Sequence, residues 1–225
     1  MTITNNWFLN IDIDDILRGQ GADPHTIRTR KPSLVAAAQR ARSERLALVH
    51  PAISTREVAV RESGQAQIVL EDGAILAGKG VVRHLAGAQR LVAAACTIGK
   101  ELEETVASLL DADPLYALAL DGLGNAAVER LAQQVCQHIS QRAQAEGLSA
   151  STPFSPGSPD WPLEIGQPQL LEMVAAGEIG IQVTPGGMMI PKKSITFITG
   201  LGTQMKQTDP CKVCNLQETC HYHLA

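Results

Sequence analysis

The sequence has few aromatic residues and no long hydrophobic run. Aromatic residues make up 3% of the 225 residues, so the core must be aliphatic, and surfaces that stack on nucleic-acid bases are not expected. The longest apolar runs, Leu91 to Cys96 and Leu115 to Leu120, span six residues each, whereas a membrane span needs about 20. No basic stretch followed by an apolar one begins the chain. We therefore expect a cytoplasmic protein without a signal peptide or a membrane partner.

An excess of positive charge is also absent. Lys and Arg total 19 and Asp and Glu total 23, which gives a formal net charge of −4. Proteins that bind nucleic acids are usually basic, so no nucleic-acid partner is expected. The hydrophobic fraction of 44% and the charged fraction of 19% are typical of a globular protein and exclude disorder over the whole chain.

Several short patterns predict strands. An Asp72-Gly73 pair lies between two apolar runs, which is the signal of a β-hairpin. The run from Leu91 to Thr97 predicts a buried strand because it is apolar throughout. Two further strands are expected at residues 179–184 and 194–199. Together with the predicted helices, these patterns indicate an α+β fold with a central twisted, mostly antiparallel sheet flanked by helices.

The longest predicted helix begins at Pro114 and reaches about Ala145, because proline is favoured in a first turn. A shorter helix is expected at residues 168–175. One stripe of the long helix places small residues, among them Gly122 and Ala126, beside the single carboxylate of Glu129. Small residues permit close approach of another backbone or of a ligand. Two interpretations stay open: a helix–helix contact with an exposed glutamate, or a ligand surface that includes Glu129.

The C-terminal segment predicts a metal site. Cys211 and Cys214 are separated by two residues, so both sulfurs can face one point, and Cys220 can complete a three-thiolate cap. Thiolates select zinc or iron–sulfur clusters. His221 or His223 would complete a zinc site, whereas a cluster would keep a non-cysteine or open fourth position. A tail that binds no metal is the alternative.

The Cys-rich segment is expected to lie outside the folded domain. We expect one domain over residues 1–203 and a Cys-rich tail over residues 204–225. Cys96 and Cys136 lie in apolar segments and are expected in the core. The sequence has no phosphate-binding glycine loop, no helical pair of metal-binding histidines and no framed nucleophile serine. No catalytic residue is therefore predicted.

Four stretches, taken in their order and spacing, resemble the activation domain of cobalamin-dependent methionine synthase and the stand-alone proteins similar to it. The stretches are Ala95–Gly99, Leu120–Glu129, Phe154–Glu164 and Met188–Ser194. The resemblance covers roughly residues 10–203, and many stand-alone relatives also end in a cysteine cluster. It implies the fold of that domain.

The resemblance also implies a function in methionine biosynthesis. In that family the activation domain binds S-adenosylmethionine and docks on cobalamin that has become inert through oxidation. An electron, typically from flavodoxin, and the methyl group then restore the cobalamin. The expected function is a reactivation subunit for a separate cobalamin-carrying methionine synthase or corrinoid methyltransferase. The residues that the resemblance assigns to cofactor binding are Glu129, Pro156, Gly157, Ser158, Asp160, Trp161 and Met189, with Asp12 as a further acidic candidate.

The sequence departs from the family at the ligand clamp. The family loop reads Arg-x-x-x-Gly-Tyr, and alignment on Gly157 places Pro153 at the Arg position and Ser158 at the Tyr position. A lost guanidinium at a bidentate site costs roughly 30- to several-thousand-fold in affinity, so weak S-adenosylmethionine binding is expected. A second function therefore stays open: a non-catalytic docking or metal-binding accessory protein of a corrinoid methyl-transfer system.

The resemblance predicts a docking face as well. The loop at residues 153–161 and the turn containing Met188 and Met189 are expected to face the partner's corrinoid, because methionine side chains adapt to flat surfaces. The alternative is that both methionines are ordinary core residues.

Overall fold

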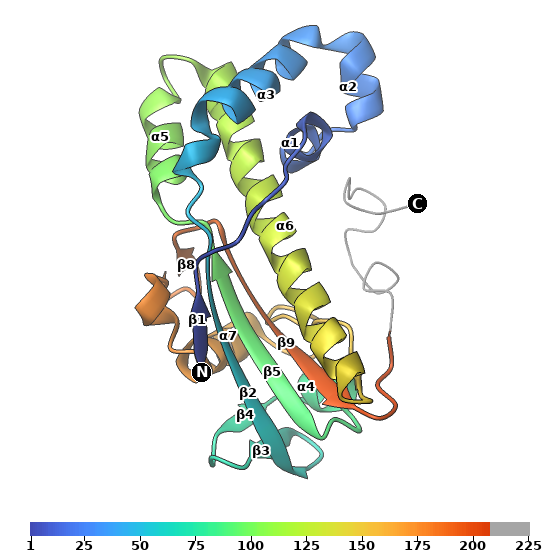
Figure 1. Ribbon diagram of the computed structural model, residues 1–225. Helices are drawn as coiled ribbons and strands as arrows, with labels where there is room; N and C mark the ends of the chain where they lie inside the picture. The colour runs from blue at the N-terminus through green and yellow to red at the C-terminus, as the bar shows by residue number, and fades with distance from the viewer. Residues whose placement is uncertain (208–225) are drawn as a thin grey trace.

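The computed structural model describes residues 1–207 of the chain. It shows one α+β domain in which a curved sheet carries helices on both faces (Figure 1). The strands are β1 (Thr2–Thr4), β2 (Ala52–Ser63), β3 (Gln67–Leu70), β4 (Ile75–Ala77), β5 (Arg90–Thr97), β6 (Ser149–Ala150), β7 (Gln182–Val183), β8 (Met189–Ile190) and β9 (Ser194–Gly202). The helices are α1 (Ile13–Gly19), α2 (Pro24–Arg30), α3 (Pro32–Arg45), α4 (Lys79–His84), α5 (Glu101–Leu109), α6 (Pro114–Ala145) and α7 (Leu163–Met173), with 3₁₀ turns η1 (Leu46–Leu48) and η2 (Ala176–Ile179).

The main sheet has seven strands in the order β4-β3-β2-β5-β9-β6, and β1 also pairs with β2. Each of these pairs is antiparallel, which confirms the predicted fold class. The long strand β2 shifts register between Val60 and Glu62. Its first part pairs with β1 and its last part with β3. The central strand β5 is buried from Leu91 to Thr97, because both of its faces are covered.

One face of the sheet is covered by α6, whose predicted bounds are confirmed. Asp113 caps the helix by accepting a hydrogen bond from the Tyr116 backbone amide, and Pro114 follows in the first turn. Helices α1, α3 and α5 pack against α6. A Cβ atom on Gly19 would lie 2.2 Å from the carbonyl oxygen of Gly122. A Cβ atom on Gly122 would likewise lie 2.6 Å from the carbonyl oxygen of Ile16. The absence of a side chain at both positions thus permits the close approach of α1 to α6.

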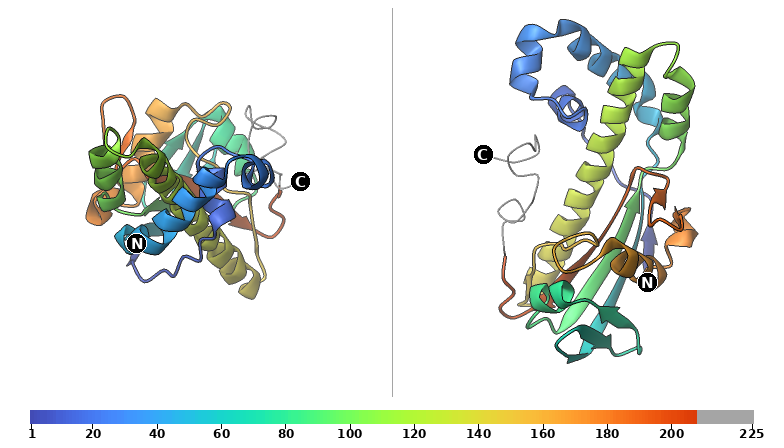
Figure 2. Two further views of the ribbon diagram at one scale, coloured as in Figure 1. Left: turned by 90° about the horizontal axis from the view of Figure 1, so that it is seen from above. Right: turned by 180° about the vertical axis from the view of Figure 1, so that it is seen from behind.

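The opposite face is covered by α7, α4 and η2 (Figure 2). The prediction for this region was partly wrong. Pro168 lies inside α7 and does not begin it, because the helix is held by its buried residues Leu170 and Leu171 despite the hydrogen bond that proline removes. A strand was expected at residues 179–184, but only residues 182 and 183 form one, the short strand β7. The strand cannot begin earlier because Gly180 adopts a left-handed conformation with φ of 79°. Strand β7 pairs with β8 in a separate hairpin.

Within residues 1–207, no helix combines the length and the apolar character that a membrane crossing requires.

Candidate functional site

The loop that leads from β6 to α7 is held against the sheet by a stack of rings. Phe154 forms an isolated bridge with Ile198 of β9, with a hydrogen bond of 2.9 Å in each direction. The Phe154 ring lies between His84 of α4, at a centroid distance of 4.4 Å, and Trp161, at 5.5 Å, and both pairs are nearly parallel. Aromatic packing therefore fixes the backbone on both sides of the Pro156-Gly157 turn.

The turn itself is closed by three backbone hydrogen bonds. The amide of Gly157 donates to the carbonyl of Trp161 at 2.9 Å, Ser158 donates to Ser155 at 3.2 Å, and Trp161 donates to Ser158 at 3.0 Å. Gly157 has a φ of 88°, a conformation that favours glycine. The Pro-Gly turn expected to approach a ligand is thus already formed.

Two predicted site residues hold this loop in place. Trp161 is fully buried, and a Cβ atom on Gly78 or Gly166 would lie within 2.8 Å of its indole. The carbonyl of Asp160 accepts a hydrogen bond from the Gly80 amide at 2.9 Å, and its exposed carboxylate pairs with Arg83. The Trp161 ring accordingly faces the core, and Asp160 connects the loop to α4.

Glu129 lies on α6, outside this loop, and is partly buried. One turn earlier, Asn125 donates to the carbonyl of Gly19 at 2.8 Å and accepts from the Lys193 ammonium at 2.7 Å. The Glu129 carboxylate has no hydrogen-bond or ion-pair partner in the described part of the chain, and burial raises its pKa. A partly buried carboxylate without a cation is a candidate for ligand binding.

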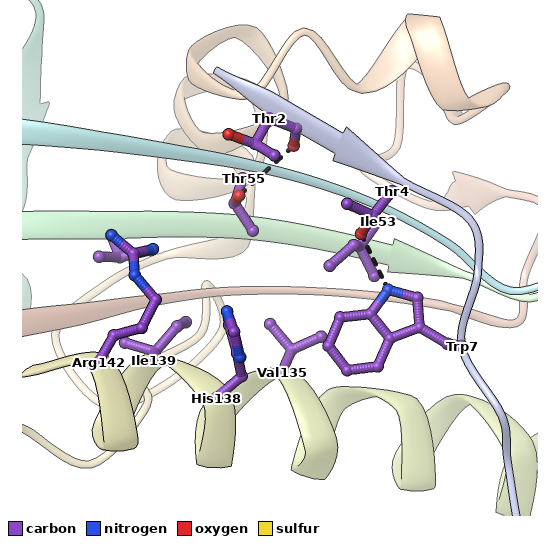
Figure 3. Close-up of a pocket in the computed structure, with 10 residues that line it drawn as sticks. Thr2, Thr4, Trp7, Ile53, Thr55, Val135, His138, Ile139 and Arg142 are labelled. Carbon is purple, nitrogen blue, oxygen red and sulfur yellow. Dashed lines mark hydrogen bonds between the residues drawn. The ribbon is translucent and has the colours of Figure 1, made fainter.

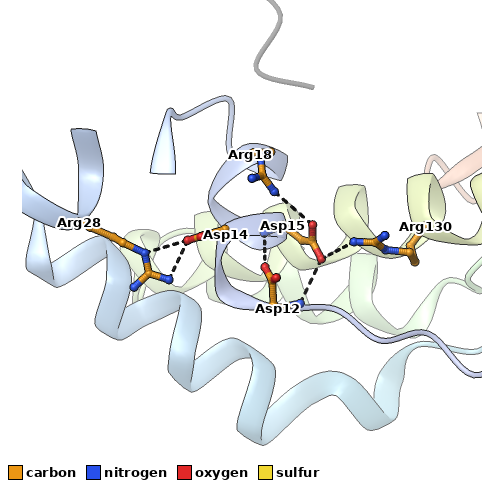
Figure 4. Close-up of polar contacts among 6 residues, drawn as sticks. All are labelled: Asp12, Asp14, Asp15, Arg18, Arg28 and Arg130. Carbon is orange, nitrogen blue, oxygen red and sulfur yellow. Dashed lines mark hydrogen bonds and ion pairs between the residues drawn. The ribbon is translucent and has the colours of Figure 1, made fainter. Parts of the chain in front are cut away.

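The cations nearest in sequence to Glu129 and to Asp12 are engaged elsewhere (Figure 4). Arg130 donates to Asp15 at 2.8 Å, and Arg18 donates to the same carboxylate at 3.3 Å. Asp12 caps α1, because its carboxylate accepts from the Asp15 amide at 2.8 Å and its own amide donates to the Asp15 carboxylate at 3.1 Å. Asp12 and Asp15 therefore form a reciprocal capping box.

The loop and the β7–β8 turn are neighbours through one side chain. Leu163 would lie 3.9 Å from a Cβ atom on Gly157 and 3.4 Å from one on Gly187. Met188 is exposed, whereas Met189 is partly buried against the core of α7 and the sheet. The structure thus places the predicted loop and the predicted methionine turn side by side, and Met188 is the methionine that faces solvent.

The predicted metal ligands Cys211, Cys214 and Cys220 lie outside the described residues, as do His221 and His223. Across residues 1–207, no group of three or more His, Cys, Asp or Glu side chains is placed to hold a metal ion.

The other two cysteines lie in or against the core, as predicted. Burial raises the pKa of the Cys96 thiol far above its usual value, and it raises the pKa of Cys136 to about 12. Both are therefore protonated at neutral pH, which makes them poor nucleophiles and poor metal ligands.

Replacing Glu129 by Gln should stabilise the protein at neutral pH. Because the folded-state pKa of Glu129 is raised, the ionised carboxylate opposes folding at pH values above its unfolded pKa of about 4.3. The free energy of unfolding of Glu129→Gln should exceed that of the wild type at pH 7, and the difference should vanish below about pH 4. Urea unfolding at several pH values measures this, with Glu172→Gln, on the exposed side of α7, as the matched control. An equal response of both variants would contradict the prediction.

The comparisons with known proteins identify the fold. No known family's sequence profile matches the chain, and no curated protein matches it in sequence. Among solved structures, the chain is similar to the MetH reactivation domain bound to AdoHcy, with a TM-score of 0.66 and 11% sequence identity. The match covers 92% of this chain and 81% of that chain. The resemblance expected from the four stretches is thereby confirmed at the level of the fold.

Proposed function

We propose that this chain is a reactivation subunit that docks on a separate cobalamin-carrying methionine synthase or corrinoid methyltransferase. The observation that carries the proposal is the likeness to the MetH reactivation domain over 92% of the chain. The preformed Gly157 turn supports it, because that turn lies in one of the stretches that resemble the family. The chain's own contribution is to position the partner and to shield the reacting site.

A surface suited to such a partner lies beside the loop. Large apolar side chains of α7 and of the β7–β8 hairpin are exposed there, and Leu163 joins the two elements by its contact with Gly187. Exposed apolar patches mark interaction sites, and methionine adapts to a flat macrocycle. This surface is called the docking face, and it comprises Leu163 and Met188, which are both exposed.

The residues present fit only part of S-adenosylmethionine. Glu129 has no cationic partner and would suit the amino group of the ligand. The ligand carboxylate has no cationic partner at the loop. Pro153 and Ser158 occupy the two clamp positions, and the nearby cation Arg83 already pairs with Asp160. We therefore derive no methyl-transfer step from this chain and expect weak binding of the ligand.

Charging the docking face should weaken the complex with the corrinoid partner. The double variant Leu163→Glu and Met188→Glu places two carboxylates where apolar surface is to be desolvated, so affinity should fall at least tenfold. Surface plasmon resonance with the cobalamin-binding methionine synthase of the same organism measures this. The matched control is Leu115→Glu and Leu118→Glu at the start of α6, where two leucines are similarly exposed. Unchanged affinity of the first variant, or an equal loss in the control, would refute the assignment of this face.

A second function is favoured by the missing clamp: a metal-binding accessory protein of the same corrinoid system. In this case the three tail cysteines, Cys211, Cys214 and Cys220, hold a metal centre that has taken over redox or structural work. Zinc would only fold the tail because it has no redox chemistry, whereas an iron–sulfur cluster would permit electron transfer.

Metal analysis of the protein purified without oxygen should therefore find one centre per chain. Brown protein with iron and sulfide would support electron transfer, and colourless protein with stoichiometric zinc would support a structural site. Exchange of Cys211 and Cys214 for Ser should remove the metal, whereas Cys136→Ser, in or against the core, should retain it. Protein that stays metal-free after reconstitution would exclude the site.

A further inference from the structure

A pocket of about 100 Å³ lies between α6 and the paired strands β1 and β2 (Figure 3). Its floor is apolar, and it is on the side of α6 opposite to Glu129, because His138 follows Glu129 by nine residues, or about 180° around a helix. None of the predicted cofactor residues and none of the docking-face residues lines it. The floor residues are Ile53, Val92, Val135 and Ile139.

Polar groups stand at both ends of this floor. At one end, the indole of Trp7 donates to the Thr4 hydroxyl at 2.9 Å and meets the His138 ring edge-on at a centroid distance of 6.3 Å. At the other end lies Arg142 (Figure 3), whose side chain is 52% exposed and which donates through Nη2 to Glu57 at 3.0 Å.

Arg142 and His138, which line the pocket, can form more hydrogen bonds than they have among residues 1–207. An arginine carries five N–H donors, and for Arg142 only the bond to Glu57 was found among residues 1–207. His138 has a ring contact with Trp7 but no hydrogen bond in that part of the chain. An apolar floor with a few convergent polar groups is the usual composition of a small-molecule site.

We propose that this pocket binds a small monocarboxylate with a short apolar tail. The remaining donors of Arg142 match the two oxygens of a carboxylate, and the tail would lie on the aliphatic floor towards Trp7. An engineered cavity of about 150 Å³ holds the six carbon atoms of benzene, so the smaller volume of this pocket suits an apolar tail of about three or four heavy atoms, with the carboxylate at the partly exposed Arg142. This site is independent of the proposed reactivation function.

The intrinsic fluorescence of tryptophan can report ligand binding in this pocket. It has two tryptophans: Trp7 lines the pocket and Trp161 is fully buried elsewhere. A ligand in the pocket should therefore alter the emission of Trp7 and leave that of Trp161 unchanged. The variant Trp7→Phe retains only Trp161 and should lose the response.

The test is a fluorescence titration of the full chain with isobutyrate and with isobutyramide, its neutral isostere. We expect a saturable change with isobutyrate in the millimolar range and at least tenfold weaker binding of the amide. Arg142→Gln should weaken isobutyrate binding at least tenfold, and Arg142→Lys should weaken it less because the charge is kept. Arg61→Gln, which removes an exposed arginine on β2, should bind as the wild type does.

Three results would overturn the proposal: no saturable change with isobutyrate, equal binding of acid and amide, or a response that persists in Trp7→Phe. The comparison of acid and amide uses the wild type alone, so it decides the matter even if a variant fails to fold. Binding of the corrinoid partner should be unchanged in Arg142→Gln, which separates this site from the docking face.

Discussion

Replacing Pro153 by Arg and Ser158 by Tyr together should tighten S-adenosylmethionine binding by roughly 30-fold to several-hundred-fold. A guanidinium at position 153 would restore bidentate recognition of the ligand carboxylate. The loop can accept both changes. Pro153 is exposed, and the hydrogen bonds of residue 158 are made by its backbone amide and carbonyl. The stack of Phe154 between His84 and Trp161 holds the backbone next to the new arginine.

Isothermal titration calorimetry of the wild type and the double variant measures the gain. Pro185→Arg adds the same charge to the neighbouring exposed turn and should leave the affinity unchanged, which controls for general attraction of the ligand carboxylate. Adding Glu129→Gln to the double variant should reverse part of the gain, because the carboxylate that suits the amino group is lost. Equal affinity of the wild type and the double variant would show that this loop no longer presents the family's ligand geometry.

Parts of the fold that depend on local sequence were predicted correctly. The bounds of α6 follow from a proline in the first turn and a continuous apolar stripe. Strand β5 follows from its apolar run, and the hairpin of β3 and β4 follows from Asp72-Gly73. The pairing of β1 with β2 and the start of α7 before Pro168 were not predictable, because partners distant in the sequence and buried side chains decide them.

In the candidate site, too, a feature set by local sequence was predictable, and features set by distant residues were not. The left-handed turn at Gly157 was foreseeable, because a Pro-Gly pair favours it. The burial of Trp161 and its stacking on Phe154 were not, because His84 and Gly78 come from a segment about 80 residues earlier in the chain. The pocket beside Trp7 also escaped prediction, since only folding brings that residue next to α6.

Replacing Trp161 by Ala should destabilise the protein by about 3–5 kcal/mol, the usual loss for a large aromatic side chain in a core. Trp161 has no exposed surface and fills the space left by two glycines. A Cβ atom would lie 2.8 Å from the indole at Gly78 and 2.6 Å from it at Gly166. Removal of the indole also takes away one ring of the stack around Phe154, so the Pro156-Gly157 turn should lose its support.

Urea unfolding measures this loss, and Phe8→Ala is the matched control because the Phe8 side chain is 86% exposed. The control should change the free energy of unfolding by less than about 0.5 kcal/mol. Trp161→Phe should cost less than Trp161→Ala, because the indole N–H has no hydrogen-bond partner among the described residues and a phenyl ring fills part of the space. A loss below about 1 kcal/mol for Trp161→Ala would mean that the loop is held mainly by its bridge to Ile198 and by the backbone bonds of the turn.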